Sequence, residues 1–243
     1  MPSKTRSKTA PDKDTSSDGL KRRRLYGRRR GRVLRKGRKA LLEELLPKLR
    51  IEIGDGPLDP AALFDRPVAD IWLEIGFGAG EHLAARAAAH PDVGFLGAEH
   101  YLAGIASLLK HIADADLDNV RILTDDAALL LDALPDACLD RVFLLYPDPW
   151  PKARHEKRRF LSHENLDKLA RVTKPGAELL VATDHPIYLA WAVERMASRT
   201  DFTWLAERPR DWRDPPPDWP GTRYEAKAIK QGRKPTYLSY RRD

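Results

Sequence analysis

Apolar residues recur along this chain in two patterns, short continuous runs and longer segments with helical spacing. Short continuous runs predict buried strands, whereas apolar residues spaced three and four apart predict amphipathic helices. The predicted strands are 71–75, 93–98, 120–123, 139–146 and 177–182, with late candidates at 202–205 and 237–240. The predicted helices are 40–49, 81–90, 105–115, 127–134, 161–172 and 186–198. This alternation predicts an α/β fold with a doubly wound, mostly parallel sheet.

Two prolines mark expected boundaries within this pattern. Pro47 is expected to break the helix 40–49 near its end, because proline cannot donate a backbone hydrogen bond and clashes with the preceding turn. The tripeptide Lys174-Pro175-Gly176 predicts a turn immediately before the fifth strand.

The composition favours one globular domain with a polar appendage. Of 243 residues, 42% are hydrophobic and 33% are charged. No apolar run approaches the roughly 20 residues needed to cross a bilayer, and the first residues lack the apolar core of a secretory signal. We therefore expect a cytoplasmic protein without a membrane partner, and no obligatory protein partner is evident. One cysteine, Cys138, and seven histidines without ligand spacing predict neither disulfides nor a metal site.

The net charge of +7 is distributed unevenly. Residues 1–39 carry 16 Lys and Arg against 3 Asp, a net of +13, and the remainder carries −6. The first twenty residues are polar and cannot bury enough apolar surface to offset the entropy of ordering. We expect 1–39 to be a basic, largely disordered arm and 40–243 to be the folded domain. A solvated tail or a localisation signal is the alternative to nucleic-acid binding, which the cation density and Tyr26 favour.

The most distinctive block is Pro147-Asp148-Pro149-Trp150-Pro151-Lys152, directly after the predicted strand 139–146. Asp148 is therefore expected at the carboxyl end of a strand, the edge at which open α/β sheets bind ligands. Trp150 has two open interpretations, stacking on a base or packing beneath the loop. A basic cluster follows the block, made of Arg154, His155, Glu156, Lys157, Arg158 and Arg159.

A glycine-rich turn, Gly76-Phe77-Gly78-Ala79-Gly80, follows the first predicted strand. Glycines there let the backbone approach a ligand closely. The dinucleotide fingerprint G-x-G-x-x-G requires glycine where this chain has Glu81. The shorter G-x-G-x-G turn with Glu74 just before it is the form found in methyltransferases that use S-adenosylmethionine. The alternative is a turn needed only for packing, since such motifs have many false positives.

Two further acids follow the next two predicted strands. Glu99, at the end of the second strand, is placed to hold both hydroxyls of a ribose, and Asp126, after the third, is within reach of an adenine amino group. Glu74 is placed to bind the amino group of a methionine moiety. Each acid also has a structural alternative, as a helix cap, a solvated loop residue or a first-turn acid facing a helix dipole. Their recurrence at successive strand ends favours a nucleoside-containing cofactor.

Together these motifs resemble the bacterial tRNA (guanine-N7-)-methyltransferase family, from Tyr26 to the carboxyl terminus. The resemblance also includes Ala182-Thr183-Asp184 and Thr222-Arg223-Tyr224-Glu225. It implies that 40–243 form a Rossmann-like class I methyltransferase domain that uses S-adenosylmethionine. The chain departs from the family at Tyr146, where Phe is common, and in the Pro- and Trp-rich segment 211–220 of the late substrate loop.

The resemblance implies three groups of site residues. The cofactor S-adenosylmethionine would contact Glu74, Gly76, Glu99, Asp126 and Asp148, of which Asp148 would also be catalytic. The substrate guanosine region would contact Lys152, Asp184, Thr222, Arg223, Tyr224 and Glu225. The tRNA would contact Arg154, His155, Glu156, Lys157, Arg158 and Arg159.

The predicted reaction is methyl transfer to N7 of a tRNA guanine. Guanine N7 carries an unprotonated lone pair, so no base has to remove a proton before it attacks a sulfonium methyl. The resemblance implies a guanine in the variable loop, and a loop position fits because the A-form major groove is too narrow for side chains. Two alternatives stay open: a methyltransferase for another RNA or a protein, and a non-catalytic RNA-binding module, which has no need of acids at three strand ends.

Overall fold

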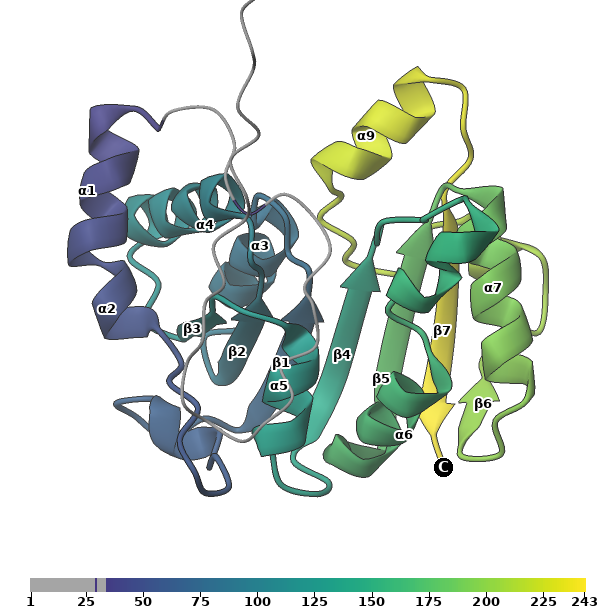
Figure 1. The fold of residues 1–243 in the computed structure, drawn as a ribbon, viewed down its shortest axis with the longest axis horizontal. Coiled ribbons are helices and arrows are strands. Elements are labelled where there is room, and N and C mark those ends of the chain that lie inside the picture. Colours follow the sequence, from purple (N-terminus) through teal and green to yellow (C-terminus); the bar gives the residue numbers. More distant parts are fainter. Residues whose placement is uncertain (1–28, 30–33) are drawn as a thin grey trace, which may run out of the picture.

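The computed structural model describes residue 29 and residues 34–243 (Figure 1). In this part of the chain one sheet has the strand order β3-β2-β1-β4-β5-β7-β6. Strands β1 to β5 are mutually parallel, and β7 runs antiparallel to both β5 and β6. The predicted α/β class with a mostly parallel sheet is confirmed. The strands are β1 Asp70–Ile75, β2 Val93–Ala98, β3 Val120–Leu123, β4 Leu139–Leu145, β5 Thr173–Thr183, β6 Phe202–Trp204 and β7 Thr236–Arg242.

Helices cover both faces of this sheet. Helices α5, α6 and α7 pack on one face, α3 and α4 pack on the other, and α1 packs against α4. Figure 1 shows α9 beyond the carboxyl ends of β4 and β5. The helices are α1 Lys36–Glu44, α2 Leu46–Leu49, α3 Glu81–Ala89, α4 Leu102–Ala115, α5 Ala127–Ala133, α6 His163–Val172, α7 Pro186–Ala197, α8 Arg210–Arg213 and α9 Arg223–Lys230, with 3-10 turns η1 Ala61–Leu63 and η2 Ala153–Arg158.

Strand β1 lies at the point where the strand order reverses. From β1 the chain proceeds to β2 and β3 on one side and then returns to β4 on the other. Connections leave the sheet in opposite directions there, which creates a crevice at the carboxyl ends of β1 and β4. Side chains of β1 alternate between the two cores: Leu73 belongs to the α5–α7 side and Trp72 to the α3–α4 side.

Several predicted boundaries were wrong, each for a local reason. The helix 40–49 begins earlier, at Lys36, but the break expected near Pro47 is confirmed: α1 ends at Glu44, and Pro47 lies in the first turn of α2, where its missing N–H costs nothing. The predicted turn 174–176 lies inside β5 as an irregularity in its pairing with β4, and Gly176 takes a φ of 83° there. Strand β4 ends at Leu145 because Tyr146 has a left-handed φ of 51°.

The carboxyl-terminal region was only partly predicted. The late strands 202–205 and 237–240 correspond to β6 and β7, and the residues 222–225, for which no helix or strand was predicted, begin α9. Thr222 is its N-cap and forms a reciprocal capping box with Glu225. Of the predicted arm 1–39, residues 1–28 and 30–33 lie outside the described residues, and the carbonyl of Arg29 accepts the N–H of Leu102 at 3.1 Å.

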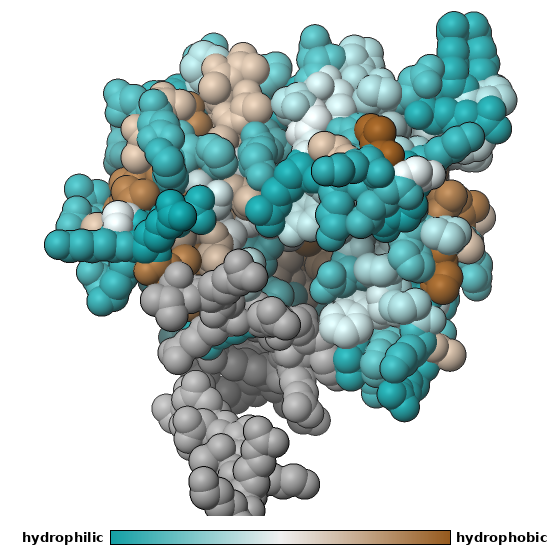
Figure 2. All heavy atoms as spheres, turned by 90° about the horizontal axis from the view of Figure 1, so that it is seen from above, coloured by the Kyte–Doolittle hydropathy of each residue, from teal (hydrophilic) through white to brown (hydrophobic). Residues whose placement is uncertain are grey.

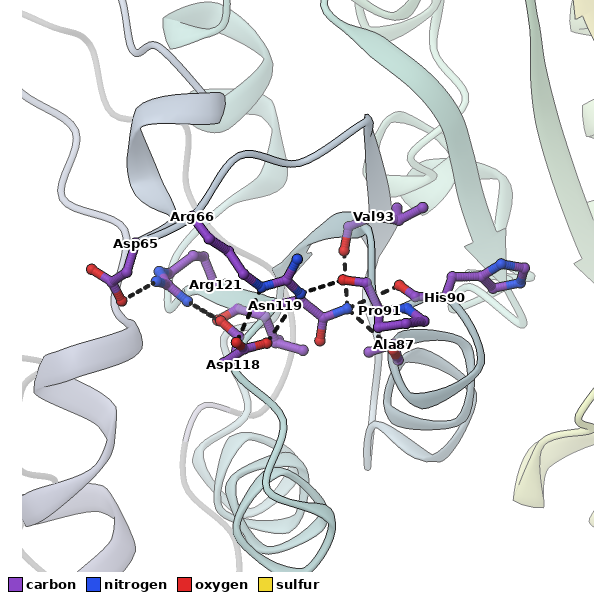
Figure 3. A network of polar contacts seen from close by, with 10 residues as sticks. Asp65, Arg66, Ala87, His90, Pro91, Val93, Asp118, Asn119 and Arg121 are labelled. Carbon is purple, nitrogen blue, oxygen red and sulfur yellow. Dashed lines mark hydrogen bonds and ion pairs between the residues drawn. The ribbon is translucent and has the colours of Figure 1, made fainter.

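A polar network fastens the loops at the amino-terminal edge of β2 and β3 (Figure 3). The side-chain amide of Asn119 donates to the carbonyls of Ala87 at 3.1 Å, His90 at 3.1 Å and Val93 at 2.9 Å. Arg121, 6% exposed, donates from Nη1 to the carbonyl of Asp118 at 2.9 Å. Buried carbonyls need such donors, so Asn119 joins the end of α3 to the start of β2.

Replacing Asn119 with Asp should test this network. The two side chains have the same shape, but a carboxylate cannot donate and would face three carbonyl oxygens at a site that is 2% exposed. We expect the free energy of unfolding in urea to fall by about 3 kcal/mol. Asp118→Asn is the matched control, because the Asp118 side chain is 69% exposed and its pair with Arg66 is worth less than about 1 kcal/mol. Equal effects of the two substitutions would contradict this account.

Candidate functional site

A cavity of about 480 Å³ lies at the carboxyl ends of β1, β2, β3 and β4. This volume is within the range of roughly 300–1,000 Å³ typical of small-molecule sites. Figure 2 looks onto this edge, which is mainly hydrophilic and has a recess near the middle of the view. The predicted site residues that line the cavity are Gly76, Glu99, Asp126, Asp148, Lys157, Arg158, Arg159 and Tyr224.

The glycine turn between β1 and α3 is left-handed at three positions, Gly76 at 69°, Gly78 at 59° and Gly80 at 80°. A Cβ on Gly80 would lie 2.7 Å from Leu108 of α4, whereas a Cβ on Gly76 would meet nothing within 4 Å. Helix α4 approaches the same turn through Gly104, where a Cβ would lie 2.0 Å from the carbonyl oxygen of Gly78. The turn is thus packed against α4 on one side and open to a ligand at Gly76.

Glu99 fixes this turn to the end of β2. Its Oε2 accepts the N–H of Gly78 at 3.0 Å, and its Oε1 accepts the N–H groups of His100 at 2.8 Å and Tyr101 at 2.9 Å. The side chain is 10% exposed and lines the cavity. A carboxylate held in this way is oriented before any ligand binds.

Asp126 has both of the roles considered for it. It is the N-cap of α5, since its Oδ1 accepts the N–H of Ala128 at 3.0 Å, and it also lines the cavity. Asp125 lines the cavity beside it, and its Oδ1 accepts the N–H of Asp126 at 2.8 Å. The sequence analysis missed Asp125, although its position one residue before Asp126 was a usable signal.

Glu74 lies beneath the turn and is not among the residues that line the cavity. It is 4% exposed, and its Oε2 lies 2.7 Å from Nδ1 of His82, which is 3% exposed. Strand alternation places Glu74 on the α3 side of β1, and a buried carboxylate there requires a partner. His82 was not predicted, because nothing in a single sequence shows which histidine of a helix faces the strand.

The loop after β4 is held in an unusual backbone conformation. Tyr146 and Trp150, on either side of Asp148, have φ values of 51° and 41°. Such values are rare for bulky residues and persist only where neighbours enforce them. Arg159 supplies that restraint: its Nε donates to the carbonyl of Pro149 at 3.0 Å and its Nη2 to that of Trp150 at 3.1 Å. Arg159 is 6% exposed and stacks on Trp191 at 4.7 Å, so it braces the loop from below.

Asp148 lines the cavity from this braced loop. Within 34–243, no hydrogen bond or ion pair engages its carboxylate, in contrast to Glu74, Glu99 and Asp126. Trp150 also lines the cavity, with the guanidinium of Arg158 4.9 Å from its ring centroid. The lining therefore combines an available carboxylate with a cation-flanked indole.

The remaining predicted residues lie around the cavity. Of the predicted guanosine contacts, Tyr224 lines it, with its ring 2.9 Å from where a Cβ on Gly78 would be. Asp184 pairs with Arg233 at 2.6 Å, and Arg223 lies 3.7 Å from Glu81. The predicted residues absent from the lining are Glu74, Lys152, Arg154, His155, Glu156, Asp184, Thr222, Arg223 and Glu225.

Further residues complete the lining and were not predicted. They include Tyr146, whose pKa is raised chiefly by burial and further by nearby Tyr237 and Glu225, so its hydroxyl stays protonated. Residue types that pack in any core carry no motif that marks them as part of a site. The other lining residues for which no role was predicted are Ile75, Ala98, His100, Tyr101, Ala127, Leu144, Leu145, Phe160 and Asn165.

The polar groups that line the cavity fit a nucleoside. Glu99 and Asp126, at successive strand ends, are hydrogen-bond acceptors for hydroxyl and amino groups, and the backbone at Gly76 leaves room for close approach.

The described helices include none that is both long and apolar enough to cross a membrane. Residue 29 and residues 34–243 contain no group of three or more His, Cys, Asp or Glu suited to a metal ion.

Comparisons with known proteins agree on one family. A family model described as "Putative methyltransferase" matches residues 68–238. The chain is 49% identical over 223 residues to a tRNA (guanine-N(7)-)-methyltransferase of Rhodospirillum rubrum, covering 90% of this chain and 88% of that protein. It is 48% identical over 243 residues to the protein of the same name from Ruegeria pomeroyi, covering 97% and 98%.

Solved structures share the fold. The 16S rRNA methyltransferase KamB has a TM-score of 0.50 and 18% sequence identity, over 72% of this chain and 89% of that one. At this identity the likeness concerns the fold alone, and it confirms the predicted Rossmann-like architecture.

Gly104→Ala should test the contact between α4 and the glycine turn. Alanine normally favours a helix over glycine by about 1 kcal/mol, but here its Cβ would lie 2.0 Å from the Gly78 carbonyl. We expect a loss of about 2 kcal/mol in the free energy of unfolding. Gly37→Ala in α1 is the matched control, since nothing lies within 4 Å of a Cβ there. A neutral or stabilising Gly104→Ala would refute the contact.

Proposed function

Because this chain belongs to the tRNA (guanine-N(7)-)-methyltransferase family, we propose that it transfers a methyl group from S-adenosylmethionine to N7 of a guanine in tRNA. The observation that carries the proposal is the exposed carboxylate of Asp148, which has no partner within the described residues and stands on a braced loop at the edge of the nucleoside-sized cavity. An exposed carboxylate is solvated at little cost, so Asp148 can exchange its water for groups of the substrate, whereas Glu74, Glu99 and Asp126 already have protein partners.

Each proposed cofactor residue binds a different part of S-adenosylmethionine. Glu99 holds the ribose hydroxyls, Asp126 accepts from the adenine amino group, and Gly76 lets the backbone approach the methionine moiety. Glu74 orients that end of the site from beneath, through its pair with His82. When bound, the cofactor supplies an electrophilic methyl group on a sulfonium.

Asp148 acts on the guanine rather than on a proton of the nucleophile. N7 attacks through a lone pair, so the protein mainly has to align the base with the methyl group. Such alignment can lower the activation free energy by on the order of 7 kcal/mol. Asp148 accepts a hydrogen bond from the exocyclic amine or ring N–H of guanine and stabilises the positive charge that spreads over the purine. Its position between Pro147 and Pro149, braced by Arg159, keeps that carboxylate in place.

The proposed RNA contacts surround the cavity. Tyr224 covers the glycine turn, and Lys157 and Arg158 line the cavity on the side of the Asp148 loop, where phosphates would approach. The basic arm adds phosphate contacts, and the target is proposed to be a guanine in the variable loop. A tRNA substrate also makes the cytoplasm the proposed location.

Substitution of the acceptor atom tests the reaction. Labelled S-adenosylmethionine is supplied with unmodified tRNA transcripts that carry either guanine or 7-deazaguanine. We expect transfer of label to the guanine transcript and none to the 7-deaza transcript, because carbon replaces the nucleophilic nitrogen. Equal labelling of the two transcripts would redirect the activity to another atom, and no labelling of either would count against a tRNA methyltransferase.

Asp148→Asn tests the role of the carboxylate. The amide keeps the size of the side chain but loses its charge, so we expect kcat for tRNA methylation to fall about 100-fold. Asp136→Asn is the matched control, since Asp136 is 78% exposed in its pair with Arg171 and lies outside the cavity lining. Both variants are assayed at saturating cofactor, with the cofactor Kd measured separately. Full turnover by Asp148→Asn would remove Asp148 from the mechanism.

A further inference from the structure

The indole of Trp219 joins two parts of the molecule that are distant in sequence. Trp219 lies between α8 and α9, in the Pro- and Trp-rich segment 211–220, and packs against the core on the α3–α4 side. Its Nε1 donates to Oε2 of Glu225 at 2.7 Å. Its ring centroid is 4.9 Å from that of His82 and 5.4 Å from that of Tyr237, the latter edge to face. Trp219 therefore contacts α3, β7 and α9 together.

On the α9 side, the Trp219 bond completes the coordination of a buried carboxylate. Glu225 is 9% exposed; its Oε2 also accepts the N–H of Thr222 at 3.2 Å, and its Oε1 accepts the hydroxyl of Tyr237. Burial and the bond to Glu225 raise the pKa of Tyr237, which keeps that hydroxyl a donor. These donors hold the first turn of α9 in one place, because each is lost if the helix shifts.

On the α3 side, the segment is fastened at two successive residues. His82 contacts the Trp219 ring, and Arg86, one turn further along α3, donates from Nη1 to the carbonyl of Asp218 at 3.2 Å. His82 is itself bonded to Glu74 at the end of β1. Helix α3 begins directly after the glycine turn. The contacts of Trp219 with α3 therefore fix its position relative to the turn that shapes the cavity.

The position of α9 determines the position of Tyr224. Tyr224 directly precedes Glu225, and its ring covers Gly78 and lines the cavity, although the residue is 42% exposed. A displaced first turn of α9 would therefore move Tyr224 away from the turn.

We propose that Trp219 is a positioning residue that sets α9, and through it Tyr224, against the glycine turn so that the guanine and the methyl donor are aligned. This inference rests on the proposed function and adds a residue that none of the sequence motifs contains. Trp219 touches neither ligand; it acts through Glu225 and Tyr224.

Trp219→Phe tests the inference because it keeps an aromatic ring against His82 but removes the N–H donor to Glu225. We expect kcat/KM for tRNA to fall about tenfold or more, as for loss of a hydrogen bond to a charged acceptor, while the Kd for S-adenosylmethionine changes less than twofold. Trp212→Phe in the same segment is the matched control, since Trp212 contacts the opposite core and has no part in the Glu225 cluster. Indistinguishable tRNA kinetics of the two variants would overturn the proposal.

Introducing Trp219→Phe into a Tyr224→Ala variant separates a positioning role of Trp219 from general destabilisation of the fold. In Tyr224→Ala, which removes an exposed side chain, Trp219→Phe should lower kcat/KM by less than a further twofold, because its effect passes through Tyr224. A full tenfold loss in that background would show a merely structural role. If the wild-type chain transferred no methyl group, the proposed function would fail. The same four proteins would then be compared by their Kd for tRNA, where Trp219→Phe should weaken binding tenfold only when Tyr224 is present.

Discussion

The arrangement of the cavity depends on the close contacts that three elements make with one residue of the glycine turn, Gly78. Its N–H is bound by Glu99, its carbonyl faces Gly104 of α4, and its Cα is covered by the Tyr224 ring. Its φ of 59° and the absence of a side chain are both needed, because any Cβ would meet Tyr224. The end of β2, helix α4 and helix α9 therefore converge on a single peptide unit. The cavity has its shape because all three elements contact that peptide unit.

The acids near the cavity differ in how their charge is compensated, and that difference separates structure from chemistry. Backbone N–H groups hold Glu99 and Asp126, and side chains hold Glu74 and Glu225. Removing charge from water is costly unless hydrogen bonds replace the lost hydration, so these four are satisfied before any ligand binds. Asp148 is exposed to solvent and so needs no such compensation, and no hydrogen bond engages its carboxylate within the described residues. Its carboxylate can form its hydrogen bonds to the substrate, which is the economical arrangement for a group that must bind developing positive charge.

Local patterns were enough to predict the α/β class with a mostly parallel sheet and the acids at strand ends, because the alternation of strands and helices is visible in short stretches of sequence. They failed where a role is fixed by a distant partner. Arg159 was grouped with the phosphate-binding cations, yet it braces the Asp148 loop and stacks on Trp191. Thr222 and Glu225 were assigned to the substrate contacts alone, although Thr-x-x-Glu is also a capping signature that local reasoning could have recognised. His82 and Asn119 have partners that only the folded chain brings close.

The Pro- and Trp-rich segment shows why such partners lie so far apart in sequence. Strands β6 and β7 are antiparallel neighbours, so the segment between them stays at the edge of the sheet where β6 ends, and its Trp219 packs on the side of α3 and α4. There Trp219 packs against His82 and Tyr237, and Arg86 reaches Asp218 across 132 residues of sequence. Prolines restrict the unfolded conformations of that segment and lower the entropy cost of ordering it. The segment that joins β6 to β7 therefore also fixes the position of α9 over the glycine turn.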